Sequence, residues 1–328
     1  MLPVLRSKTP CKRLFSTTLR PRIAPRSTFS PSISPRTPPI ATSIRRVRAV
    51  HTGPIQPKPA KMSNEPKVDL STFLDPSLPS RVYGLWFQHI ADEQHLTLPT
   101  QEAFQRWFAK DAGFDLECAT QFKPILAAIH QARPELQTEA QVEAQAEQIL
   151  DLVNPSSALD WLGLVVLLDQ LPRNCYRGEE SALVYTFFDP LSRAIALRAL
   201  DQGIDSSSPD VRYRITLRQW FYLPLMHSED LGHQDIALKK YDEMKEVVNR
   251  LLDEQPSGLS EQEQVYRETL ASNREAALKV CEQNSKFQKE HHDLIARFGR
   301  YPYRNQVLGR NPTPEEEKFF REENVSFA

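Results

Sequence analysis

Glycine is scarce in this sequence: there are only ten in 328 residues, and many of the 26 prolines lie in the first sixty positions. The rest of the chain therefore has few of the residues that break helices or form tight turns. Its apolar residues recur three and four positions apart, which is the spacing of one helix face, and no stretch shows a convincing strand pattern. These features predict a mostly helical protein.

Cysteine is also rare, since the chain has only Cys11, Cys118, Cys175 and Cys281. They are too widely separated for a zinc site and too few for a secreted disulfide scaffold, so we expect free thiols in a reducing compartment. No apolar run approaches the roughly 20 residues that span a bilayer. We therefore expect no membrane insertion.

Acidic residues are absent from residues 1–61, which contain nine Arg and four Lys among many Ser, Thr and Pro residues. Such a composition cannot build a core, and Arg13-Leu14-Phe15-Ser16 resembles the cleavage region of mitochondrial presequences. We predict a disordered basic targeting segment here and a mitochondrial location. If translation starts at Met62 instead, the segment is lost and a cytoplasmic location is expected.

The rest of the chain is acidic. Without the thirteen basic residues before Met62 it has 28 basic and 42 acidic residues, which is a net charge of −14. Nucleic-acid-binding domains usually carry clustered positive charge, so this balance argues against a nucleic-acid partner.

Residues 79–322 are expected to form a single all-α domain, in which short loops join consecutive helices as antiparallel hairpins. Thr100 is a predicted helix N-cap. Ser157 and Ser260 each precede an acidic residue by three positions, which is the pattern of a capping box. Residues 133–150 are rich in Gln and Glu, and we predict a surface insertion or an exposed helix there.

The helix expected at Ala158–Leu171 is apolar on almost every side and should be central to the body. Pro172 is expected to end it. Asp189 followed by Pro190 predicts the start of another helix, with Asp189 as its N-cap. A single long helix is expected over 260–298.

Five segments carry a resemblance to a known family: LLDQLPRNCYRG (167–178), DPLSRAIALRAL (189–200), FYLPLMHSED (221–230), HHDLIARFGRYPYRNQVLGR (291–310) and TPEE (313–316). In this order they resemble the family called domain of unknown function 924, with a match that extends over about residues 82–320. The resemblance implies an all-α fold similar to tetratricopeptide-like proteins, as a helical bundle or a short superhelix. It implies no established activity.

Two departures from the family pattern are visible: residues 133–150 look inserted, and residues 301–305 differ. The family usually has Phe-Pro-His-Arg-Asn where this chain has Tyr301-Pro302-Tyr303-Arg304-Asn305. This difference bears on any role that needs an imidazole at position 303.

The polar residues of these segments form our candidate site. His227 lies beside carboxylates and can act as a base near neutral pH, so we take His227 and Glu229 as candidate catalytic residues. Planar guanidinium groups suit phosphate and carboxylate ligands. The candidate ligand-binding residues are Asp169, Arg173, Asn174, Asp230, His291, Arg297, Arg300, Arg304 and Asn305.

A structural interpretation stands beside each of these assignments. Arg173 can simply neutralise Asp169 where a helix ends, and Asn174 can bond local backbone. Glu229 and Asp230 can serve as helix-start residues, and a histidine on an apolar face, such as His291, is more often a core residue than a ligand.

The four arginines at positions 297, 300, 304 and 310 either line an anion pocket or tie the C-terminal helix to Asp169, Glu229 and Asp230. A first-row metal would suit His227, Glu229, Asp230 and His291, but their spacing is not a recognised metal signature, so we predict no metal site. The sequence identifies no cofactor.

Two functions follow from these alternatives. One is a small-molecule site, or an enzyme, for a phosphorylated or carboxylated metabolite. The other is a helical interaction module without catalysis, in which an exposed groove binds a peptide. Both require the three charged segments at 167–178, 221–230 and 291–310 to meet in space.

Overall fold

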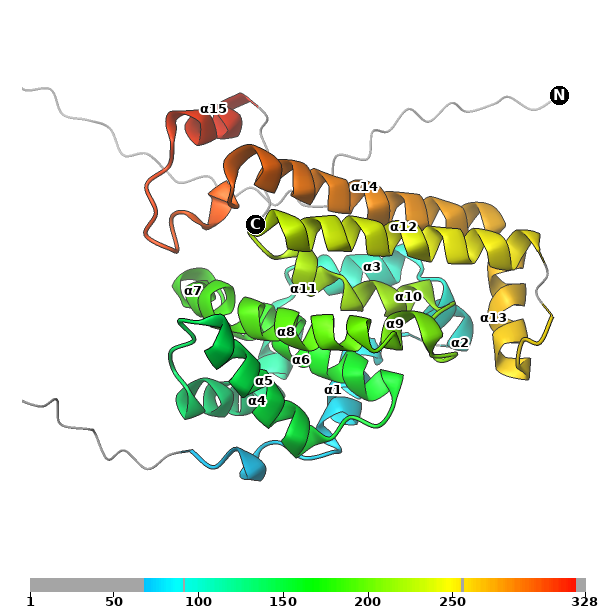
Figure 1. Cartoon of the computed structure of the whole chain (residues 1–328), viewed down its shortest axis with the longest axis horizontal. Helices are drawn as coiled ribbons and strands as arrows, with labels where there is room; N and C mark the ends of the chain where they lie inside the picture. The colour runs from blue at the N-terminus through cyan, green and yellow to red at the C-terminus, as the bar shows by residue number, and fades with distance from the viewer. Residues whose placement is uncertain (1–67, 91, 255–256, 323–328) are drawn as a thin grey trace, which may run out of the picture. The chain divides into compact units, whose positions relative to one another are not determined.

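The fold is known from a computed structural model that describes residues 68–90, 92–254 and 257–322. All regular elements among these residues are helical (Figure 1), so the predicted all-α fold is confirmed. The described residues belong to one unit of the chain. The predicted targeting segment, 1–61, lies outside them and stays a prediction. None of the described helices is long and apolar enough to cross a membrane.

The first part of the fold contains η1 (Leu70–Thr72), α1 (Leu78–Phe87), α2 (Glu93–Thr97), α3 (Gln101–Phe108), α4 (Ala112–Ala132), α5 (Glu139–Val153) and α6 (Ala158–Cys175). The middle contains η2 (Gly178–Glu180), α7 (Ser181–Leu183), the π-helix η3 (Val184–Phe188), α8 (Asp189–Asp201), α9 (Ile204–Ser207), α10 (Ile215–Arg218), η4 (Gln219–Phe221) and α11 (Leu223–Met226). The last part contains α12 (Leu231–Asp253), α13 (Glu261–Ser272), α14 (Arg274–Phe298), η5 (Pro302–Arg304) and α15 (Pro314–Glu322).

Helix α6 lies at the centre of the core, as its apolar sequence predicted. All its residues from Trp161 to Pro172 are buried, and α1, α4 and α8 pack against it. The contact with α1 is close at Gly163, where an added Cβ would lie 2.5 Å from the carbonyl oxygen of Pro79. A glycine at this position therefore lets the two helices approach.

The predicted N-caps are confirmed, because the side chains of Thr100, Ser157 and Ser260 each accept a hydrogen bond from a backbone N–H three residues later. Residues 133–150, which we predicted to be a surface insertion or an exposed helix, include most of α5. Only part of α5 is exposed, because one face buries Val142, Ala146, Ile149 and other residues in the core.

The prediction that Pro172 ends its helix is wrong. Helix α6 continues to Cys175, and the N–H of Tyr176 still bonds the carbonyl of Pro172 at 2.9 Å. A proline inside a helix removes one backbone donor and crowds the preceding turn. Here the guanidinium of Arg173 donates to the carbonyl oxygen of Asp169 at 2.8 Å, so a side chain supplies a hydrogen bond in the turn that contains the proline.

Asp189 is not an N-cap, because the π-helix η3 runs directly into α8. Pro190 lacks an N–H, so a regular α-helical bond cannot form at this position. The chain makes a wider turn instead, and the N–H of Asp189 bonds the carbonyl of Val184. Such π turns often occur at functional sites. The carboxylate of Asp189 caps no helix and is available for other contacts.

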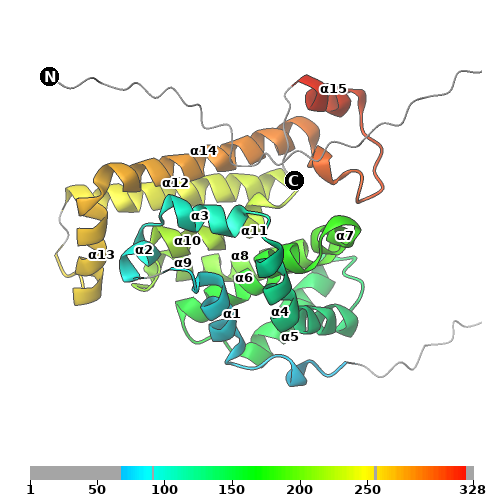
Figure 2. The same ribbon diagram turned by 180° about the vertical axis from the view of Figure 1, so that it is seen from behind.

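The single helix predicted over 260–298 is in fact two helices. Asn273 has a non-helical backbone and separates α13 from α14, while its side-chain amide donates to the carbonyl of Thr269 at 2.9 Å. Helix α14 then returns antiparallel along α12 (Figures 1 and 2), as expected for a helical hairpin. The tetratricopeptide-like stacking of such hairpins stays a prediction.

Candidate functional site

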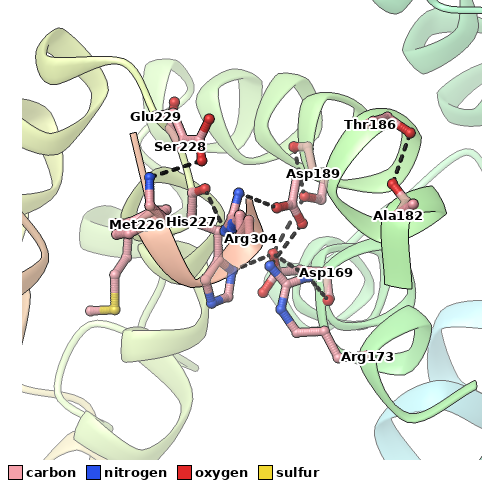
Figure 3. Close-up of polar contacts among 12 residues, drawn as sticks. Asp169, Arg173, Ala182, Thr186, Asp189, Met226, His227, Ser228, Glu229 and Arg304 are labelled. Carbon is pink, nitrogen blue, oxygen red and sulfur yellow. Dashed lines mark hydrogen bonds and ion pairs between the residues drawn. The ribbon is translucent and has the colours of Figure 1, made fainter. Parts of the chain in front are cut away.

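Four segments distant in the sequence meet at one place: the end of α6, the start of α8, the turn from α11 to α12, and η5 (Figure 3). Asp169 Oδ1 lies 2.9 Å from His227 Nδ1. Arg173 Nη2 lies 2.7 Å from Asp189 Oδ1, and Arg304 Nη1 lies 3.3 Å from Asp189 Oδ2. Arg304 also donates to the carbonyl oxygen of His227 at 3.0 Å. The sequence therefore identified four of these five residues.

The residue that it missed is Asp189, whose carboxylate lies between two guanidinium groups and is only 2% exposed. The segment 189–200 was part of the family resemblance, which was the available signal. However, the Asp-Pro pair was interpreted as a helix start. With this local interpretation, the pairing of Asp189 with distant arginines was not predicted. One buried carboxylate thus joins α6 to η5 through Arg173 and Arg304.

The Arg304 guanidinium is also enclosed by aromatic rings. It lies 4.4 Å from the ring centre of Tyr185 and 4.6 Å from that of Tyr301, both within cation–π range. Its Nε donates to the hydroxyl of Tyr303 at 3.4 Å. The tyrosine at position 303 therefore contributes to holding Arg304.

The protonation of the Asp169–His227 pair follows from its surroundings. Burial alone would raise the pKa of Asp169, but His227 and Arg173 lower it to about 2. An ionised carboxylate can only accept, so Nδ1 of His227 carries the proton that bonds it. Burial and Arg173 lower the pKa of His227 against the opposing effect of Asp169, so the ring is neutral at pH 7 and Nε2 has a free lone pair.

This arrangement gives His227 the features of a general base. Its side chain is 16% exposed, and its Nε2 has no hydrogen-bond partner in the described part of the chain. A carboxylate that fixes the orientation and tautomer of an imidazole is found at many sites of proton transfer.

A pocket of about 300 Å³ adjoins the pair, and its walls are formed by Tyr185, Asp189, Pro190, Arg193, His227, Ser228, Glu229, Asp230, Arg304 and Leu308. Arg193 differs from the other arginines of this region, because it forms no hydrogen bond or ion pair within the described ranges. Burial lowers its pKa, but a guanidinium remains protonated in proteins. The pocket therefore holds one positive charge without a partner.

Glu229 is bound by the C-terminal part of the chain. Its Oε1 accepts from the N–H of Tyr301 at 2.9 Å, and Arg310 donates to both carboxylate oxygens at 2.7 and 3.0 Å. Burial opposes ionisation, but the bonds from Arg310 and Tyr301 lower the pKa of Glu229. A carboxylate held on both oxygens is a poor proton acceptor, so the geometry favours the alternative in which a C-terminal arginine ties to Glu229.

The candidates Asp230, Asn174 and His291 each make contacts of a different kind. Asp230 lines the pocket and caps α12 by accepting from the N–H of His233 at 3.1 Å. The side chain of Asn174 donates to Asp115 on α4 at 2.8 Å, rather than to local backbone. His291 is buried against Tyr301, and its Nδ1 lies 2.9 Å from the carbonyl oxygen of Phe287, which agrees with a core histidine.

The other C-terminal candidates hold α15. Arg300 donates to both oxygens of Glu316 at 2.7 and 2.8 Å, and Asn305 donates to Glu316 at 3.1 Å. Arg297 bonds Glu315 at 2.9 Å. Of the four C-terminal arginines, Arg310 therefore ties to Glu229, as one of the two alternatives expected. Arg300 does not, because it binds Glu316 on α15 instead.

Replacing Arg300 by alanine is expected to loosen α15. Glu316 is 1% exposed, and Arg300 is the first of the contacts that lower its pKa to about 2. Loss of the guanidinium leaves the Glu316 carboxylate with fewer hydrogen-bond donors, which destabilises the packing of α15. Amide hydrogen exchange over 314–322 should become faster.

Arg321→Ala is the matched control for this prediction, because Arg321 is an exposed arginine on α15 that contacts Glu317 at 3.7 Å. This substitution should change the free energy of local opening, as measured by amide exchange over 314–322, by less than about 0.5 kcal/mol. Equal exchange rates in the two variants would contradict a clamping role for Arg300.

The site also contains a possible metal-ligand set. One atom each from Asp169, Asp189 and His227 lies within 4.8 Å of the other two. The carboxylate of Asp189 is already neutralised by Arg173 and Arg304, however, and Asp169 is bonded by the ring of His227. A divalent cation would have to displace these donors, so the arrangement suits an ion-pair network better than a metal centre.

Comparison with known proteins places most of the chain in a family without known function. A family model described as a bacterial protein of unknown function (DUF924) matches residues 82–324. A protein of unknown function, ATU0120 from Agrobacterium tumefaciens, is 29% identical over 75% of this chain and 98% of its own, with a TM-score of 0.44. No curated protein matches the chain.

Proposed function

We propose that this chain, which belongs to the DUF924 family, binds a small anionic molecule in the pocket beside α8, and that His227 exchanges a proton with it. The observation that carries the proposal is the unpaired guanidinium of Arg193 in the same pocket as His227.

The anionic character of the ligand follows from Arg193. A guanidinium that is partly withdrawn from water and has no counter-ion is in an unfavourable environment. A carboxylate or phosphate group that entered the pocket would give it charge-assisted hydrogen bonds. The pocket therefore favours anions over neutral molecules.

The role of His227 follows from its pairing with Asp169. The neutral ring is fixed by one nitrogen, so its other nitrogen keeps a constant direction and an available lone pair. A base of this kind needs its substrate within hydrogen-bond reach. We assign proton transfer to His227 and the orientation of its ring to Asp169, while Glu229 binds the N–H of Tyr301 just before η5 and the guanidinium of Arg310.

The alternative of a peptide-binding module has less support. The large exposed apolar side chains in the described part of the chain are Leu116, Leu231, Ile236, Val265 and Phe320. They lie on α4, α12, α13 and α15, and the two on α12 are five positions apart. These scattered side chains do not form the continuous apolar groove into which an amphipathic peptide helix would dock.

A thermal-shift screen of carboxylated and phosphorylated metabolites on the full chain tests the proposal. We expect a compound that stabilises the wild-type protein and binds His227→Gln about tenfold more weakly, because one hydrogen bond to the ligand is lost.

The matched control is His292→Gln, since His292 is a histidine on α14 that pairs with Asp235 at 3.0 Å outside the pocket. The control should bind the compound as the wild type does. An anion that stabilises all three proteins equally would argue against a role for His227.

A further inference from the structure

We infer that the ligand of this pocket is an organic monocarboxylate with a small apolar body, and that Arg193 selects for its single negative charge. This inference rests on the proposed function and narrows it from anions in general to one class.

The first argument is the charge already matched inside the site. Asp189 lies between Arg173 and Arg304, and Arg173 also lies 3.9 Å from Asp169. These two carboxylates and two guanidiniums cancel within one network. The charges of Glu229 and Arg310 cancel in the same way through a bidentate pair. Neither group has a net charge to offer a ligand.

The second argument is that Arg193 is the positive charge left over. It lies one helical turn after Asp189 on α8, and the carboxylates that act on it from a distance are Glu139, Asp189 and Asp230. None of them forms an ion pair with it in the described part of the chain. A ligand with one negative charge would form an ion pair with Arg193. A second negative charge on the ligand would have no cation to pair with and would be repelled by these carboxylates.

The third argument is the character of the walls. Tyr185, Pro190 and Leu308 contribute apolar surface, and the volume of about 300 Å³ is at the lower end of ligand pockets. An inorganic anion would leave this surface in contact with water. A small organic body would cover it, with its carboxylate on the planar fork of Arg193.

The test compares ligands of one size and different charge on the full chain. Benzoate has one negative charge, phenyl phosphate is a dianion at pH 8 because its second pKa is near 6, and benzamide is neutral. Calorimetric titration at pH 8 is expected to show the tightest binding for benzoate.

Three variants locate the binding. Arg193→Gln should bind benzoate about tenfold more weakly, and Arg193→Lys should lie between this variant and the wild type because the charge remains without the fork. Arg198→Gln should bind as the wild type does, since Arg198 is on the same helix but pairs with Glu143 at 2.7 Å outside the pocket. Arg193→Gln should keep its melting temperature, because Arg193 makes no bond that the fold would lose.

The outcomes separate this inference from the proposed function. Tighter binding of phenyl phosphate than of benzoate, lost in Arg193→Gln, would overturn the monocarboxylate class but leave an anion site at Arg193. Absence of benzoate binding, equal binding of benzamide, or unchanged binding in Arg193→Gln would overturn the inference. The screen with His227→Gln would then decide the proposed function separately.

Discussion

Replacing Asp189 by alanine is expected to lower the free energy of unfolding by about 3–5 kcal/mol, which is the usual cost of removing one partner from a buried ion pair. The side chains of Arg173 and Arg304 are 20% and 4% exposed and both contact this carboxylate. Without it, two guanidiniums of like charge would remain close together and poorly hydrated. Urea denaturation at pH 7 measures the change.

An exposed ion pair provides the control for this prediction. Asp253 pairs with Arg274 at 2.6 Å, but both side chains are about half exposed, so Asp253→Ala should cost less than about 1 kcal/mol. Replacing Arg304 by methionine in the Asp189→Ala variant should recover part of the loss, because one unpaired charge is removed. A cost for Asp189→Ala no larger than that for Asp253→Ala would contradict the proposed network.

Acidification from pH 7 to pH 4 is expected to cost about 3 kcal/mol through His291 alone. Burial is the main reason why the pKa of His291 is lowered from 6.5 to about 4. A histidine whose pKa is lower in the folded state than in the unfolded state binds fewer protons when folded. Its contribution to stability is therefore complete above pH 6.5 and is lost as the pH falls toward 4.

The variant His291→Gln checks this assignment, since glutamine can still donate to the carbonyl of Phe287 but does not titrate. Its unfolding free energy should change less between pH 6.5 and 4 than that of the wild type. His292→Gln removes a neighbouring surface histidine and should keep the wild-type slope. Parallel curves for His291→Gln and the wild type would contradict the assignment.

The buried carboxylates act in a different pH range. Asp169 and Glu316 have pKa values of about 2 in the fold, against ordinary values of 3.8 and 4.5. Groups with lowered carboxyl pKa values lose their contribution only as the pH falls below the ordinary value. As the pH falls, most of the stability that His291 contributes is therefore lost before the contributions of Asp169 and Glu316 begin to decrease.

Signals that act over a few residues could be read from the sequence. The apolar stretch of α6 and the caps at Thr100, Ser157 and Ser260 depend on neighbouring residues, and the structure has them as predicted. The meeting of the segments 167–178, 221–230 and 291–310 was also predicted, because both functional alternatives required it, but the arginine that reaches His227 is Arg304 and not Arg300. These parts of the fold are encoded locally or by strong patterns.

Features decided by packing could not be read in this way. A proline usually disrupts a helix, yet α6 continues through Pro172 to Cys175, with Arg173 donating to the carbonyl oxygen of Asp169 in the same turn. Asp189 has the local pattern of a cap, and only the π turn before it directs its carboxylate to Arg173 and Arg304. Which carboxylate takes a given arginine depends on distance in space, so the pairing of Arg300 with Glu316 was missed.

The connection of η5 to α6 and α8 through Arg304 has a consequence for how the protein is made. During translation, Asp189 and Glu229 leave the ribosome well before Arg304 and Arg310 are synthesised. Until then, one buried carboxylate lacks its second cation and the other lacks both of its guanidinium bonds. The nascent chain therefore cannot complete this site by itself as it emerges, and we expect its final ordering to wait for the last segment of the chain.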